Sequence, residues 1–319
     1  MHAASLGDIQ GALKRISPFV HRTPVMTCRT MDALSGRPLH FKCESMQRTG
    51  SFKVRGATNA VLSLEERTAA RGVVTHSSGN HGQALALAAR LRGIPCTVVM
   101  PHDSARVKKE AVRSHGATIV ECEPNAAARA AAADRVVLDT GATLIPPFDH
   151  PHIIAGQGTV ALEFLQQCPK LGAIIVPIGG GGLISGIAIA VKALRPDLRM
   201  IAAEPLNAGD AAIAKRTGRI EPVPPTQTIA DGLRTPLGHL TLPIVRDLVD
   251  EVITVTEEEI IAAMRLVWER MKIVIEPSSA VGVAVAVQDA FRARAPVATG
   301  VVLCGGNVDL DALPWMRGG

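Results

Sequence analysis

The chain has 319 residues, of which 47% are hydrophobic, 20% charged and 3% aromatic, and it carries a formal net charge of +5. Because aromatics are few and tyrosine is missing, we expect no nucleic-acid-binding surface. Basic residues are interspersed with acidic ones, so the positive net charge predicts only mild attraction for small anions. No apolar run approaches the roughly 18 residues of a membrane-spanning helix, so a membrane protein is not expected either.

The first predicted elements are an amphipathic helix over 5–16 and a short alternating strand over 39–43. A second helix follows Lys53, because small or apolar residues recur at helical spacing from Ala57 onward. Ser51 is the expected N-cap of this helix, which puts Lys53 in its first turn.

From residue 73 onward, short apolar strands alternate with helices, the pattern of parallel sheets covered on both faces. The chain is long enough for two joined domains. The expected strands are 73–76, 96–100, 117–122, 173–178, 200–204, 273–275 and 301–304, and the expected helices are 80–92, 104–115, 126–138, 156–167, 183–194, 256–272 and one from about 278.

Pro146 and Pro147 end the first part of this alternation. We therefore expect residues 72–149 to form a smaller α/β domain, inserted into a larger domain made of residues 1–71 and 150–319. The segment 222–238 is rich in Pro, Thr and Gly and is predicted to be a long loop near the functional site.

The surroundings of Lys53 favour a reactive amine. The positive end of the helix dipole and the nearby charge of Arg55 both disfavour a protonated lysine, and only the neutral amine attacks a carbonyl or accepts a proton. Gly50 and Gly56 leave room for a large group, and Phe52 offers it a flat apolar surface.

Two loops between a strand and a helix are candidate ligand sites. Gly179, Gly180, Gly181 and Gly182 expose backbone N–H groups at a helix N-terminus, a typical anion site. A dinucleotide site is the competing interpretation, because Glu204 lies about 20 residues further on, but the last glycine of G-x-G-x-x-G is missing. The other loop is Ser77-Ser78-Gly79-Asn80-His81-Gly82.

Four motifs together resemble the fold-type II pyridoxal-phosphate (PLP) enzymes, in the branch of serine/threonine dehydratases and serine racemases. They are Ser51-Phe52-Lys53-Val54-Arg55-Gly56-Ala57, Ser77-Ser78-Gly79-Asn80-His81-Gly82, Gly179-Gly180-Gly181-Gly182 and Cys304-Gly305-Gly306-Asn307. They occur in the family's order over nearly the whole chain. The resemblance implies two open parallel-sheet domains of the tryptophan synthase β-like fold, with PLP in the cleft between them.

The resemblance also implies roles for single residues. Lys53 is joined to PLP and removes the α-proton of the substrate, beside Phe52. The phosphate lies at Gly179, Gly180, Gly181 and Gly182, Asn80 binds the phenolic oxygen, Glu276 lies close to the ring, and Cys304 faces the pyridine nitrogen. The substrate contacts are Ser77, Ser78 and His81 around the carboxylate, together with Arg129 and Thr235.

Glu204, Ala208 and Asp210 match the family's divalent-metal site. Two carboxylates and the backbone carbonyl of Ala208, completed by water, would bind Mg²⁺, Ca²⁺ or Mn²⁺. Without the resemblance, two acids six residues apart are more simply a solvated pair.

The predicted function is elimination of water from an L-β-hydroxy amino acid, serine or threonine, to give a 2-oxo acid and ammonia. Ser78 resembles the residue that serine racemases use on the face opposite the lysine, whereas Phe148 resembles dehydratases. His115 stands where the mammalian racemase has a tyrosine associated with nucleotide activation. The alternatives are a serine racemase, a 3-hydroxyaspartate dehydratase with racemase side activity, and a catalytically silent ligand-binding relative.

The remaining expectations concern assembly and location. The six cysteines form no Cys-x-x-Cys pair, which indicates reduced thiols. The N-terminus has no basic segment followed by an apolar core, so we expect a cytoplasmic protein. A homodimer is the expected assembly.

Overall fold

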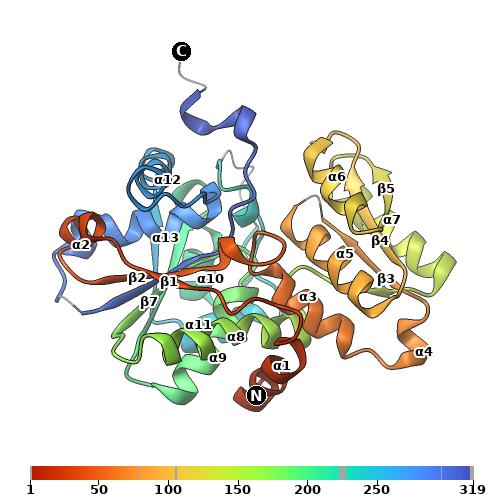
Figure 1. The fold of residues 1–319 in the computed structure, drawn as a ribbon, viewed down its shortest axis with the longest axis horizontal. Helices are drawn as coiled ribbons and strands as arrows, with labels where there is room; N and C mark the ends of the chain where they lie inside the picture. The colour runs from red at the N-terminus through yellow and green to blue at the C-terminus, as the bar shows by residue number, and fades with distance from the viewer. Residues whose placement is uncertain (1, 78, 105, 223–227, 296, 317–319) are drawn as a thin grey trace.

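The computed structural model describes residues 2–77, 79–104, 106–222, 228–295 and 297–316. Its strands form two sheets, and helices pack on both faces of each (Figure 1). The predicted α/β fold with two parallel sheets is therefore confirmed. Among the described helices, none combines the length and apolar character that crossing a bilayer requires.

The larger sheet has six strands, and every neighbouring pair is parallel except the first. In spatial order they are β1 (Val25–Met26), β2 (Leu39–Cys43), β10 (Thr299–Leu303), β7 (Ala173–Pro177), β8 (Arg199–Pro205) and β9 (Glu251–Val255). Ile174 and Val176 of β7 face one hydrophobic core, whereas Ala173 and Ile175 face the other. This alternation is what a strand covered on both sides requires.

Helices from distant parts of the chain cover the two faces of the larger sheet. One face carries α1 (Leu6–Ile16), α8 (Pro151–Gln167), α9 (Gly182–Leu194), α10 (Asp210–Thr217) and α11 (Thr241–Leu248). The other carries α2 (Arg29–Ser35), α12 (Glu257–Met271), α13 (Pro277–Val287) and α14 (Asp289–Arg292). A capping box begins α12: the Thr256 side chain accepts a hydrogen bond from the Glu259 N–H, and the Glu259 carboxylate accepts one from the Thr256 N–H.

The smaller sheet is formed by four parallel strands. Their spatial order is β5 (Thr118–Cys122), β4 (Cys96–Pro101), β3 (Val73–His76) and β6 (Thr143–Leu144). The helices α3 (Lys53–Leu62), α5 (Asn80–Arg92) and α6 (Arg106–Ser114) cover one face, and α7 (Ala126–Thr140) covers the other. The short helix α4 (Glu66–Ala69) connects α3 to β3.

Helix α3 lies between the two sheets (Figure 1), packed against α5 of the smaller part and α8 of the larger part. Its close approach to α8 depends on two glycines. A methyl group at Gly56 would lie 2.9 Å from the Ile153 carbonyl, and one at Gly156 would lie 2.6 Å from the Gly56 Cα. The helix that begins at Lys53 is therefore held at a fixed distance from α8.

Two local predictions were wrong. Residues 273–275 are not a strand but the link between α12 and α13. The Ile275 carbonyl accepts a hydrogen bond from the Trp268 indole instead of from a neighbouring strand. Ser51 does not cap α3; the N-cap is Phe52, which makes no side-chain capping bond. Instead Ser51 pairs with Gly305 in an isolated β-bridge, so tertiary pairing replaces the local cap.

Candidate active site

Lys53 is only half-buried as a residue, but its amine lies within the protein. Nζ donates a hydrogen bond to the Pro147 carbonyl at 2.8 Å and lies 5.1 Å from the centre of the Phe52 ring. Burial lowers the pKa of Lys53 from 10.5 to about 8, while Cys304 and Glu276 act in the opposite direction. A substantial fraction of Lys53 is therefore the neutral amine near pH 8.

Contrary to the prediction, Arg55 is not the cause of the lowered pKa of Lys53. Its fully buried guanidinium donates to Glu44 (Nε to Oε2, 2.7 Å) and to Glu163 (Nη1 to Oε1, 2.7 Å). These two carboxylates compensate its charge, so desolvation of the Lys53 amine is the main cause of its pKa shift. Arg55 instead anchors α3.

The four glycines form a tight loop between β7 and α9. Gly181 has a φ of 83°, a conformation that favours glycine, and a methyl group at Gly180 would lie 2.5 Å from the Phe148 ring. Within the described part of the chain, the N–H groups of Gly179, Gly180 and Gly181 donate to no acceptor. Unpaired donors at the N-terminus of α9 form an anion cradle, which fits the phosphate of PLP.

Asn80 begins α5 and connects the two sheets. Its Nδ2 donates to Glu276 Oε1 at 2.9 Å, and its Oδ1 accepts from Asn307 Nδ2 at 2.8 Å. Burial raises the pKa of Glu276 to about 7, although the Asn80 bond works against that rise. Asn80 and Glu276, which were each expected near the cofactor, are thus in direct contact with each other.

Cys304 follows β10 and reaches the same region as Lys53. Its carbonyl accepts a hydrogen bond from the Phe52 N–H at 3.0 Å, and its Sγ lies 3.4 Å from Ser279 Oγ. Burial raises the pKa of the Cys304 thiol, so the group is a neutral thiol. It would offer a ring nitrogen a weak partner without charge.

The other predicted substrate residues are spread more widely. The His81 ring is buried with Nε2 3.0 Å from the Ile145 carbonyl, and burial lowers the pKa of His81 to about 3, so the ring is neutral. Ser77 is half-buried and its hydroxyl accepts from the Gly79 N–H. Ser78 lies outside the described residues.

Arg129 and Thr235 are half-buried, the first on α7 and the second after the short 3₁₀ turn at Asp231–Leu233. The charge of Arg129 contributes, after burial, to a lowered pKa of His76 at the end of β3. For the residues that the structure describes, no hydrogen bond joins either side chain to Lys53, Asn80 or Cys304.

Glu204 and Asp210 are both buried at the carboxyl end of β8, close to Ala208. Glu204 accepts from the N–H groups of Ala211 at 2.6 Å and Ala212 at 3.0 Å. Asp210 Oδ2 is buried, and no partner for it is found in the described chain. No cluster of three His, Cys, Asp or Glu side chains suited to a metal is present among the described residues, so a cation here would need the Ala208 carbonyl and water.

Sequence reasoning missed the contribution of the segment 147–149 and of Thr241. The Pro147 carbonyl meets Lys53, Phe148 packs under the glycine loop, and the Thr241 hydroxyl donates to the Gly180 carbonyl. These contacts join segments far apart in the chain. Only Phe148 carried a local signal, as a residue typical of dehydratases.

The chain is similar to characterised proteins over nearly its full length. Residues 16–305 match the family model described as pyridoxal-phosphate dependent enzyme. The chain belongs to this family. A serine racemase from Arabidopsis thaliana is 50% identical, with 98% of this chain and 96% of the relative covered.

Two solved structures extend the comparison. That of maize serine racemase superposes with a TM-score of 0.96 at 48% identity, covering 99% of this chain and 97% of the other. That of a threonine deaminase from T.th. gives a TM-score of 0.91 at 43% identity, with 96% and 99% covered. The chain is therefore an enzyme of the PLP fold shared by racemases and deaminases, and PLP is its cofactor.

Proposed function

We propose that the protein is a serine racemase that also eliminates water from serine. The comparisons support this alternative better than the dehydratase that we predicted as the main activity, because serine racemases are 47–50% identical to the chain over nearly its whole length. The observation that carries the proposal is the desolvated amine of Lys53, which donates to the Pro147 carbonyl at 2.8 Å and lies close enough to Cys304 and Glu276 for both to influence its pKa.

These residues fit PLP. Gly179 to Gly182 would hold its phosphate, Asn80 its phenolic oxygen, and the neutral thiol of Cys304 would face its ring nitrogen. When bound, PLP withdraws electron density from the substrate Cα and so makes the α-proton acidic.

Lys53 is the base on one face of the substrate. Its neutral amine takes the α-proton and, once protonated, can return it to the same face. Racemisation needs a proton donor on the opposite face, and Ser78 is the residue we propose for that role from the sequence. Elimination instead needs loss of the β-hydroxyl after the same first proton transfer, so the two activities share Lys53.

The test is to incubate the PLP-loaded protein with L-serine and to measure D-serine by chiral chromatography and pyruvate by a coupled assay. Both products are expected from the wild type. The Lys53→Ala variant should lose about a thousandfold or more of both activities, since it removes the base. Lys170→Ala, which changes an exposed lysine, is the matched control and should behave as wild type.

Other outcomes would assign other functions. Pyruvate without D-serine would make the protein a dehydratase, and a protein that binds PLP but releases neither product would be a silent relative. Release of a 2-oxo acid from 3-hydroxyaspartate and not from serine would favour the third alternative. The homodimer and the cytoplasmic location stay predictions; light scattering on the purified protein checks the first.

A further inference from the structure

The successive residues Pro147 and Phe148 contact two of the parts that would anchor PLP, the lysine and the glycine loop. The Pro147 carbonyl accepts from the Lys53 amine, and Phe148 lies where side chains at Gly180 and Gly182 would otherwise be, with its ring at Gly180 and its Cβ and backbone at Gly182. The Asp149 carboxylate contacts neither the lysine nor the glycine loop; it accepts hydrogen bonds from backbone N–H groups at the start of α11. The segment 147–149 thus connects the lysine to the glycine loop.

Asp149 makes three hydrogen bonds to one turn. Its Oδ2 accepts from the His239 N–H at 3.0 Å, and its Oδ1 accepts from the N–H groups of Leu240 at 2.9 Å and Thr241 at 3.2 Å. A methyl group at Gly238 would overlap the Asp149 carboxylate, so the turn closes directly over it. The carboxylate therefore occupies the first N–H groups of α11, where a negative charge is favoured.

The turn that Asp149 binds also contacts the glycine loop, through Thr241. The buried Thr241 hydroxyl accepts from the Gly238 N–H at 2.8 Å and donates to the Gly180 carbonyl at 2.8 Å. Thr241 also packs against Gly181, where a methyl group would lie 2.9 Å from the Thr241 Cβ. Because the Gly180 carbonyl is held by Thr241, the orientation of the peptide between Gly180 and Gly181 is fixed.

The two helix N-termini differ in what they can still bind. At α11 the Asp149 carboxylate has taken the first donors, whereas the glycine loop before α9 keeps its N–H groups without an acceptor in the described chain. An anion that enters this region is therefore directed to the glycine loop.

We propose that Asp149 is a positioning residue that, through Thr241, holds the tetraglycine loop in the conformation that binds the phosphate of PLP. This inference rests on the proposed function only in taking PLP as the ligand. It assigns to Asp149 no contact with PLP or substrate.

The experiment is to titrate the PLP-free full-length protein with PLP and, separately, with pyridoxal, which has the same aldehyde but no phosphate. Asp149→Ala and Thr241→Val should each raise the Kd of PLP about tenfold, the effect of losing roughly one buried hydrogen bond. The Kd of pyridoxal should stay within about twofold of the wild-type value. Thr241→Ser keeps the hydroxyl and is the matched control; its Kd for PLP should stay near that of the wild type.

The double variant Asp149→Ala/Thr241→Val should be little worse than either single variant, because both changes break the same chain of contacts. Equal weakening of PLP and pyridoxal, or equal behaviour of Thr241→Ser and Thr241→Val, would overturn the proposal. If Asp149→Ala does not fold, the Thr241 pair decides alone. A wild type that binds neither ligand would refute the proposed function instead.

Discussion

Desolvation shifts Lys53 and the ionisable groups around it toward their neutral forms. Burial lowers the pKa of Lys53 to about 8 and that of His81 to about 3, and it raises the pKa of Glu276 to about 7. The site is therefore unfavourable for isolated charges, apart from the N–H groups of the glycine loop, which favour an anion. A neutral lysine amine is the form that such a site selects.

The first prediction concerns the pH dependence of PLP capture. Only neutral Lys53 reacts with the aldehyde, so the rate constant for PLP binding to the PLP-free protein should rise about tenfold per pH unit well below the pKa and level off above about pH 9. Stopped-flow absorbance measures this rate. A rise that continued to the ordinary lysine value of 10.5 would show that the amine is not desolvated in the free protein.

The second prediction concerns the opposite face of the substrate. Ser78→Ala should abolish formation of D-serine from L-serine but keep most pyruvate formation, because elimination needs only the base Lys53. Chiral chromatography and the pyruvate assay on the same sample give the ratio. Equal loss of both products would contradict a role for Ser78 specific to racemisation.

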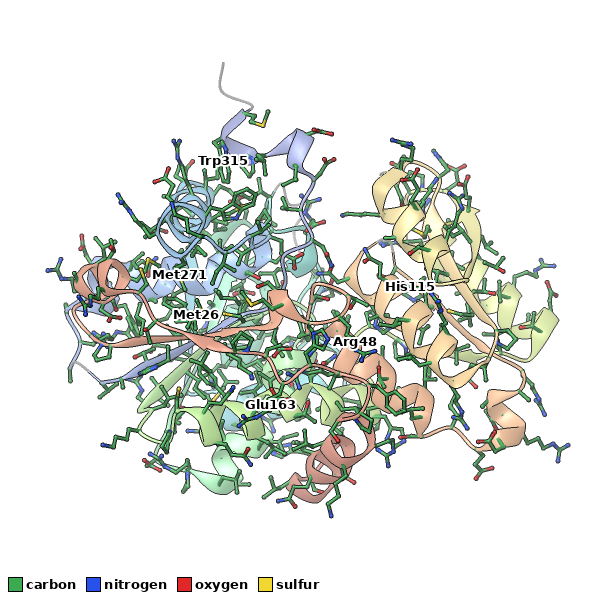
Figure 2. The ribbon with its side chains drawn as sticks, in the orientation of Figure 1. Met26, Arg48, His115, Glu163, Met271 and Trp315 are labelled. Atoms are coloured by element: carbon green, nitrogen blue, oxygen red, sulfur yellow. The ribbon has the colours of Figure 1, made fainter. Side chains whose placement is uncertain are left out.

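At the level of elements, helix α3 depends on a buried ion network. Arg55 lies two residues after Lys53 and pairs with Glu44 and Glu163, while Lys42 donates to the second of these at 2.6 Å. Figure 2 shows Glu163 among the side chains of the larger-sheet part, away from His115 in the smaller-sheet part. The network therefore fixes the start of α3 to the larger sheet and its helices.

The third prediction tests this anchoring. Arg55→Ala leaves two buried carboxylates without their main partner, so the free energy of unfolding should fall by about 3–5 kcal/mol. Arg106→Ala removes an exposed ion pair with Glu110 and should cost below about 1 kcal/mol. Urea unfolding of both variants makes the comparison; similar losses would mean that Arg55 has no special role in holding α3.

The same network shows how far sequence reasoning can reach. Local signals predicted many elements well: helix 80–92 and strand 73–76 have their predicted bounds. Arg55 and Glu163, however, are 108 residues apart, and no spacing rule connects them. A motif could indicate Lys53 and Asn80, but not the partners that fold around them.

Two elements at or near the β9 edge of the larger sheet could not be predicted from local sequence patterns. Strand β9 was not predicted, since four of its five residues are only partly buried and its apolar pattern is weak. The helix α10 was missed as well. The helix predicted over 256–272 does match α12 with its two caps, although Lys272 ends it with a φ of 62°, where most helices with this ending use glycine.

In the whole molecule, the candidate site residues gather at the carboxyl ends of the strands. The glycine loop follows β7, Glu204 lies near the end of β8, Cys304 follows β10 and Ser77 follows β3. Ligand sites of open parallel sheets lie at this edge. Side-chain contacts that link the smaller-sheet part to the larger-sheet part lie at this edge, among them Asn80 with Glu276 and Asn307, and Lys108 with Asp231 at 2.8 Å.

The divalent-cation site expected at Glu204, Ala208 and Asp210 stays a prediction, and its consequence would be for the stability of the whole chain. Burial raises the pKa of Glu204 to about 8 and that of Asp210 to about 6, so two carboxylates lie together where water solvates them poorly. A divalent cation would compensate their charge and occupy the buried Asp210 Oδ2. Without it, each carboxyl group must either carry a poorly solvated charge or bind a proton near neutral pH, and both lower the stability of the folded state.

The last prediction concerns the temperature of unfolding with and without a divalent cation. In the presence of a chelator, Asp210→Asn should unfold at a higher temperature than the wild type, because it removes one poorly solvated charge. With Mg²⁺, Ca²⁺ or Mn²⁺ the order should reverse, since a cation at 100 times its Kd adds about 2.7 kcal/mol to the free energy of unfolding of the wild type only. Differential scanning calorimetry measures both conditions. Equal shifts of wild type and variant on adding the cation would place the cation elsewhere, and no shift in either would leave the buried carboxylates as a structural pair without a metal.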